Sequence, residues 1–99
     1  MRVVFLTPAQ SELVEAKQYY NKRQTGLGER FKAVAQASAR LVAERPLSWQ
    51  RERGPVRRCL IRGFPYKLLY VVRDHEVVVI AVAHTHRKPA YWLDRLNLL

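Results

Sequence analysis

The segment from His84 to Trp92 carries two imidazoles, two cations and a phenol within eight positions. RNA cleavage without a metal needs a base for the 2′-hydroxyl proton, an acid for the leaving oxygen and a cation for the charge of the phosphorane. His86 or Tyr91, together with Arg87, can fill these roles. Alternatively, Arg87 and Tyr91 hold the C-terminal segment to the rest of the fold, and Trp92 fills space beneath it.

A second group of side chains is strongly basic and interleaved with aromatic residues. It comprises Arg51, Arg53, Arg57, Arg58, Arg62, Lys67 and Arg73. Such a stretch can follow a phosphate backbone while rings stack on bases. It can equally be a solvated sheet edge, where charges deter aggregation. Our candidates for binding a nucleic acid or another target are Arg57, Arg58, Arg62 and Lys67.

Metal, cofactor and thiol chemistry have little support in the sequence. His84 and His86 would share one face of a strand, but Cys59 and Asp94 are distant in sequence, and no ligand set has the spacing of a zinc site. The Gly26-Leu27-Gly28 stretch lacks the Lys-Ser/Thr pair of a phosphate-binding loop. We expect no metal and no cofactor, and we interpret Cys59 as a small core residue.

The length and composition of the chain limit the classes of protein to which it can belong. The 99 residues are the size of one domain, so we expect residues 1–99 to form a single domain. Eighteen Lys and Arg against eight Asp and Glu give a formal net charge of +10, which favours an anionic partner, either nucleic acid or an acidic protein segment. The single cysteine fits a reducing, cytoplasmic setting. The longest apolar run, 77–83, has the length of a strand, so we expect no contact with a membrane. The apolar N-terminus breaks at Thr7-Pro8 and lacks a cleavage site, so we expect no signal peptide.

The first half of the chain predicts a strand followed by a helical hairpin. Residues 3–6 are β-branched and aromatic, as in a strand. Thr7 and Gln10 have the spacing of a capping box, with Pro8 at the first helical position. An apolar stripe then continues to Tyr20, and the cations Lys22 and Arg23 fall in the last turn. A second helical pattern runs from 27 to the residue before Pro46, and the short connection makes the two helices antiparallel.

In the second half of the chain, apolar residues recur with a period of two. We predict strands at 57–62, 66–73 and 76–85, with a tight turn at Asp74-His75, a loop at 46–55 and a short helix at 90–96. The last strand is apolar on both faces, which indicates a central or doubly covered position. The predicted order is β-α-α-β-β-β, an α+β fold with the helical hairpin on one face of a mostly antiparallel four-stranded sheet.

Three stretches of the chain, in this order, form a recognisable pattern. They are Ala16 and Tyr19-Tyr20 leading into Gly26-Leu27-Gly28-Glu29-Arg30-Phe31; Arg57-Arg58 followed by Phe64-Pro65-Tyr66-Lys67-Leu68-Leu69-Tyr70; and Val79-Ile80-Ala81-Val82-Ala83-His84 followed by Arg87, Pro89 and Tyr91-Trp92. Together they resemble the RelE/ParE superfamily of toxins from type II toxin–antitoxin modules, and the motifs are closer to those of the ParE-like branch.

The resemblance implies a growth-inhibiting toxin that is neutralised by a cognate antitoxin with an acidic or amphipathic tail. Operator DNA would be bound only through the antitoxin complex. ParE-like members act on DNA gyrase, whereas RelE-like members cut messenger RNA on the ribosome without a metal. In the second case His86, Arg87 and Tyr91 would act over a cationic floor of Arg58, Arg62 and Lys67. A third possibility is a degenerate or purely regulatory partner of the antitoxin.

The surface that an antitoxin would contact is expected on the exposed side of the hairpin and at the sheet edge. Tyr19, Tyr20 and Phe31 are candidates, because a helical hairpin has only one face to bury against a sheet. The alternative for Tyr20 and Phe31 is a place in the core.

Overall fold

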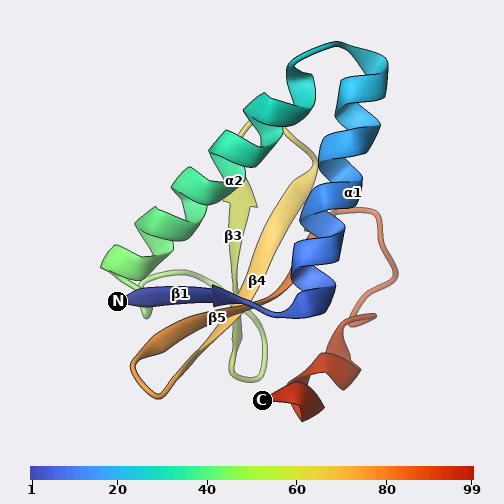
Figure 1. Cartoon of the computed structure of the whole chain (residues 1–99). Coiled ribbons are helices and arrows are strands. Elements are labelled where there is room, and N and C mark those ends of the chain that lie inside the picture. Colours follow the sequence, from blue (N-terminus) through green and yellow to red (C-terminus); the bar gives the residue numbers. More distant parts are fainter.

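The computed structural model describes residues 1–99 and places two helices on one face of a sheet (Figure 1). The elements are β1 (Arg2–Phe5), α1 (Thr7–Arg23), α2 (Leu27–Glu44), β2 (Arg51–Arg53), β3 (Val56–Ile61), β4 (Tyr66–Arg73), β5 (Glu76–His84) and the 3₁₀-helix η1 (Leu93–Leu98). The α+β class and the helical hairpin are as predicted. No helix combines the length and the apolar character that crossing a membrane requires.

The sheet has the strand order β1-β5-β4-β3-β2. The pair β1 and β5 is parallel, and the other pairs are antiparallel. The central position of β5 confirms the expectation from its apolar sequence, because every residue from Val77 to Ala83 is buried. The turn at Asp74-His75 is also confirmed. Both residues have positive φ angles, 51° and 61°, as a tight hairpin turn requires.

The sheet has five strands and not four, because the predicted loop at 46–55 contains β2. This strand is only three residues long and consists of Arg51, Glu52 and Arg53. It has no apolar alternation that a sequence pattern could detect. It forms by pairing with Val56 and Arg57 of β3, and Glu52 adds ion pairs with Arg58 of β3 and Lys67 of β4.

Two local predictions at the ends of the chain are wrong. Thr7 does not cap α1: the N-cap is Leu6, no side chain caps the helix, and Gln10 donates instead to the carbonyl of Phe5. The amide of Leu6 is bound to the Val79 carbonyl at 3.0 Å, so the strand leads directly into the helix. The C-terminal helix is a 3₁₀-helix that begins only at Leu93, after a turn in which Ala90 has a φ of 60°.

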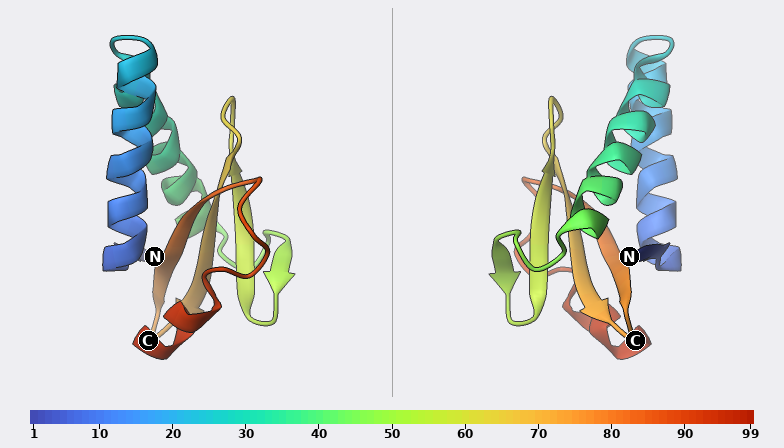
Figure 2. Two further views of the ribbon diagram at one scale, coloured as in Figure 1. Left: turned by 90° about the vertical axis from the view of Figure 1, so that its right-hand side faces the viewer. Right: turned by 90° about the vertical axis from the view of Figure 1, so that its left-hand side faces the viewer.

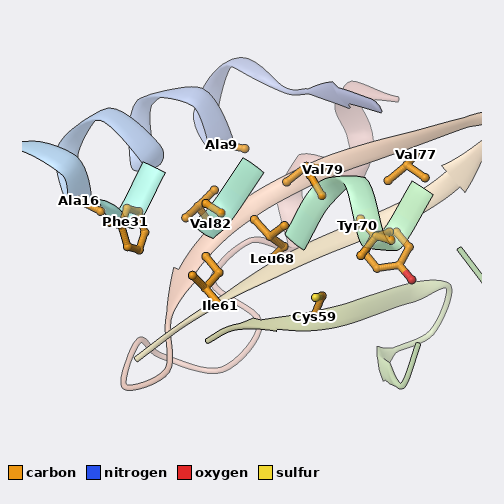
Figure 3. Close-up of a cluster of buried hydrophobic side chains, with 13 residues drawn as sticks. Ala9, Ala16, Phe31, Cys59, Ile61, Leu68, Tyr70, Val77, Val79 and Val82 are labelled. Carbon is orange, nitrogen blue, oxygen red and sulfur yellow. The ribbon is translucent and has the colours of Figure 1, made fainter. Parts of the chain in front are cut away.

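Apolar side chains form one core on each face of the sheet. The larger core lies between the helices and the sheet and includes Phe31, Cys59 and Tyr70 (Figure 3). The smaller core includes Ile80 and Trp92 and lies beneath the C-terminal segment, which crosses the face away from the helices (Figure 2). The sheet is therefore covered on both sides, and the C-terminal segment is one of the two covers.

Candidate functional site

The structure brings together part of the reactive segment that follows β5. The Arg87 guanidinium lies over the Tyr91 ring, 4.0 Å from its centroid. The rings of His84 and His86 have centroids 5.1 Å apart, and His84 Nδ1 accepts a hydrogen bond from the amide of His86 at 3.0 Å. His86 and Arg87 are exposed, whereas Tyr91 is half-buried. This arrangement offers the exposed imidazole of His86 and the cation of Arg87. Whether Tyr91 can act with them depends on the hydrogen bonding of its hydroxyl.

The Tyr91 hydroxyl is bound to Glu12 of α1. It donates to Glu12 Oε2 at 2.6 Å, and burial together with this hydrogen bond raises the pKa of Tyr91 above its ordinary value. Arg95 donates to both carboxylate oxygens of Glu12, at 2.7 and 3.0 Å, and to the carbonyl of Ile80. We call Glu12, Tyr91 and Arg95 the α1 clamp. The phenol is therefore a proton donor to a carboxylate in this fold and is poorly suited to act as a general base.

Sequence reasoning missed Glu12 and Arg95. One signal was present for Glu12: it stands beside the apolar stripe of Ala9, Leu13 and Ala16, and so faces inward. The amide of Val82 donates to its Oε1 at 3.0 Å, which ties the helix to the central strand. Arg95 gave no comparable signal, because it lies 83 residues from its partner.

The four candidate binding cations are not one free patch. Arg58 and Lys67 both contact Glu52, at 3.1 and 2.7 Å. Burial alone would raise the pKa of Glu52, but hydrogen bonds from Lys67 and Arg58 outweigh it and hold the pKa below its ordinary value. Arg57 donates to the carbonyl of Trp49 at 2.7 Å. Only Arg62 is exposed and lacks a partner within the chain.

Little space remains between the loop after β5 and the strands beneath it. The cavity between Glu52, Lys67 and the loop from Ala83 to Trp92 has a volume of about 20 Å³. A cavity of this size holds about one water molecule. A nucleotide therefore does not fit between this loop and the strands beneath it, although His84 and Arg87 also line a larger hollow beside α1.

The side chains that could take part in metal or thiol chemistry do not form a site in this structure. No group of three or more His, Cys, Asp and Glu side chains gathers closely enough to hold a metal ion, so His84 and His86 are without a third ligand. Cys59 is buried on the helix side of the sheet, and burial raises the pKa of its thiol. Its place in the core agrees with the interpretation from sequence.

Two larger hollows lie on the surface. The first, of about 570 Å³, lies between α1 and the ends of β4 and β5, and we call it the α1 cleft. Its lining is Glu12, Glu15, Tyr19, Tyr20, Arg23, Pro65, Tyr66, Val82, His84 and Arg87. The second, of about 650 Å³, lies between α2 and β3, and we call it the α2–β3 groove. Its lining is Val34, Ala37, Ser38, Leu41, Trp49, Gln50, Arg58, Cys59, Leu60 and Arg62.

The three aromatic residues considered for antitoxin contact differ in exposure. Tyr19 is 49% exposed. Tyr20 is half-buried among the rings of Phe31, Phe64 and Tyr66. Phe31 has no exposed surface, so its side chain offers nothing to a partner in this fold and belongs to the core. Of the three, Tyr19 has the most surface available for contact.

Comparison with known proteins supports a toxin–antitoxin relationship. A family model described as "ParE toxin of type II toxin-antitoxin system, parDE" matches residues 3–89. A solved structure described as "Chromosomal ParDE TA system from P. aeruginosa" is similar, with a TM-score of 0.77 and 12% identity, over 85% of this chain and 95% of that chain. At this identity the structural likeness shows a shared fold. No curated protein matches the sequence.

Proposed function

Because the chain belongs to the ParE toxin family of type II toxin–antitoxin systems, we propose that it inhibits growth by acting on DNA gyrase and that a cognate antitoxin neutralises it. The observation that carries the proposal is the family match over residues 3–89. The α1 clamp gives further support, because it removes Tyr91 as a base for RNA cleavage. The pairing of Arg58 and Lys67 with Glu52 similarly lowers the charge available to a phosphate.

We expect the purified protein to inhibit DNA supercoiling by gyrase and to increase the amount of cleaved DNA. Tyr91→Phe should change this inhibition by less than about two-fold, because the hydroxyl is occupied by Glu12 and contacts no reacting group. Circular dichroism verifies that the variant is folded. The same preparations are added to a translation reaction on the same day.

The translation reaction distinguishes the alternative. Cuts in translated messages that follow the codon frame and disappear in Arg87→Ala or Tyr91→Phe would assign the ribosome-dependent nuclease and overturn the gyrase proposal. The exposed imidazole of His86 beside Arg87 keeps this alternative worth testing. Absence of both activities would favour a degenerate or purely regulatory protein.

We propose the α2–β3 groove as the surface for the antitoxin tail. Leu41 and Leu60 are 53% and 64% exposed, and Arg62, which has no partner within the chain, also lines the groove, so that the surface matches an amphipathic, acidic segment. The edge of β3 beside it is open. The amide of Arg58 points outward to the Gln50 carbonyl, so the amide of Leu60, two residues on, points outward as well and lies beyond the end of β2.

An extended tail could therefore add a strand at Leu60 while its apolar side chains enter the groove. Leu60→Asp should weaken binding of the cognate antitoxin by about 30-fold, through lost apolar contact and charge repulsion. Isothermal titration calorimetry measures the affinity. The matched control is Leu98→Asp, since Leu98 is 60% exposed in η1 and lies outside the groove. Equal affinities for the two variants would place the antitoxin elsewhere.

A further inference from the structure

The α1 cleft is lined along one side by a single face of α1. Glu12, Glu15, Tyr19 and Arg23 recur at spacings of three and four residues, so their side chains follow one another along the helix. The opposite wall contains Tyr66 at the start of β4 together with the end of β5. The cleft therefore runs parallel to the helix, and different side chains stand at its two ends and in its middle.

Aromatic rings line the middle of the α1 cleft. The ring centroids of Tyr20 and Tyr66 are 6.1 Å apart, and those of Tyr66 and His84 are 5.0 Å apart. Tyr19 continues the series at 5.3 Å from Tyr20. The hydroxyls of Tyr20 and Tyr66 make no hydrogen bond within the chain and are not buried away from solvent. Flat ligand groups can therefore stack here and also find polar partners.

An arginine stands at each end of the α1 cleft. Arg87 lies over the ring of Tyr91, which binds Glu12, so it belongs to the Glu12 end. Arg23 lies over the ring of Tyr19 at 5.0 Å, eleven residues further along α1 than Glu12. Eleven residues of helix span about 16 Å.

The charges of the cleft favour an anionic ligand. Arg23 and Arg87 have no ion pair within the chain, while Glu12 is paired with Arg95. Glu15 is exposed and has no ion pair either. The unpaired charges are therefore two cations at the ends and one carboxylate between them. A ligand with anionic groups at its ends and uncharged, flat hydrogen-bond donors between them would match this order.

We propose that the α1 cleft binds two or three nucleotides of single-stranded nucleic acid. Phosphates contact Arg23 and Arg87, bases lie against the tyrosine rings, and Glu15 accepts hydrogen bonds from base amino groups. The spacing of the arginines suits a few nucleotides, and a cleft of about 570 Å³ has no room for a duplex. The inference goes beyond the proposed function, since it assigns nucleic-acid contact to the protein alone.

Fluorescence anisotropy with a labelled single-stranded DNA hexamer of mixed sequence, at about physiological salt, tests the proposal. The double variant R23Q/R87Q should bind about ten-fold more weakly than the wild type. The control R30Q/R40Q removes the same charge from exposed positions of α2 and should lose less than about two-fold. Tyr19→Ala should lose about five-fold, because one stacking surface is removed.

Two further probes complete the test. An RNA hexamer of the same sequence determines whether DNA or RNA is preferred, and both results agree with the proposal provided that the effects of the variants persist. A duplex of the same sequence should bind more weakly than the single strand. Equal losses in the two double variants, equal affinity for the duplex or no binding by the wild type would each overturn the inference. Gyrase is absent from every arm, so these outcomes are independent of the proposed function.

Discussion

Replacing Glu12 by Gln is expected to reduce the free energy of unfolding by about 3 kcal/mol, since Arg95, a cation largely shielded from solvent, loses its counter-charge. The side chains of Glu12 and Arg95 are only 14% and 18% exposed. The carboxylate accepts hydrogen bonds from Arg95, from the Tyr91 hydroxyl and from the Val82 amide. A Gln side chain has the same shape but carries an amide group that donates, and it would face four donors, two of them from Arg95, with one acceptor oxygen.

Urea unfolding followed by circular dichroism measures this loss, and Glu15→Gln is the matched control. Glu15 lies on the same helix and is exposed without an ion pair, so its replacement should cost less than about 0.5 kcal/mol. The double variant E12L/R95L, which removes both charges, should be more stable than E12Q, because no unpaired charge remains buried. If E12Q and E15Q unfold at the same urea concentration, the α1 clamp does not stabilise the fold.

The same contacts explain why the site was only partly predictable. Arg87 and Tyr91 were found because they are neighbours in sequence, and the structure keeps them within 4.0 Å. Their surroundings depend on Glu12, which is separated from Tyr91 by 79 residues. A contact between residues so far apart in the chain leaves no pattern in the local spacing of residue types. The sequence therefore identified a chemically rich segment, while the tertiary contact gave Tyr91 a role in holding the chain together.

The fold was predictable wherever a periodic pattern ended at a strong local signal. Strand β4 has the predicted bounds, and α2 ends before Pro46 as expected, because the residue preceding a proline leaves the helical region. Strand β2 lacked such a signal, since its pairing depends on β3 and on the contacts of Glu52. Periodicity placed Phe31 on an apolar face, but the depth of its burial depends on the rings of Phe64 and Tyr66, which come from the other half of the chain.

Gly28 is expected to be as sensitive to substitution as Glu12, because α2 packs against α1 at this position with no room for a Cβ atom. A Cβ at this position would stand 2.1 Å from the carbonyl oxygen of Lys17 and 2.6 Å from Cγ of Asn21. The amide of Gly28 also donates to Asn21 Oδ1 at 2.7 Å. The Lys17 carbonyl is part of the α1 backbone, so the clash can be relieved only by moving one helix against the other.

Gly28→Ala should therefore destabilise the protein by about 3 kcal/mol, at the upper end of the usual cost of overpacking. The sign of this change in the free energy of unfolding is diagnostic, since alanine in a helix is otherwise favoured over glycine by about 1 kcal/mol. Gly26→Ala is the control: its φ of 88° imposes strain, but a Cβ there meets nothing within 4 Å, so we expect a loss of about 1 kcal/mol. Thermal and urea unfolding of both variants compare the two costs. If Gly28→Ala is no less stable than Gly26→Ala, the helices can separate freely and the hairpin is not a rigid wall for the α1 cleft.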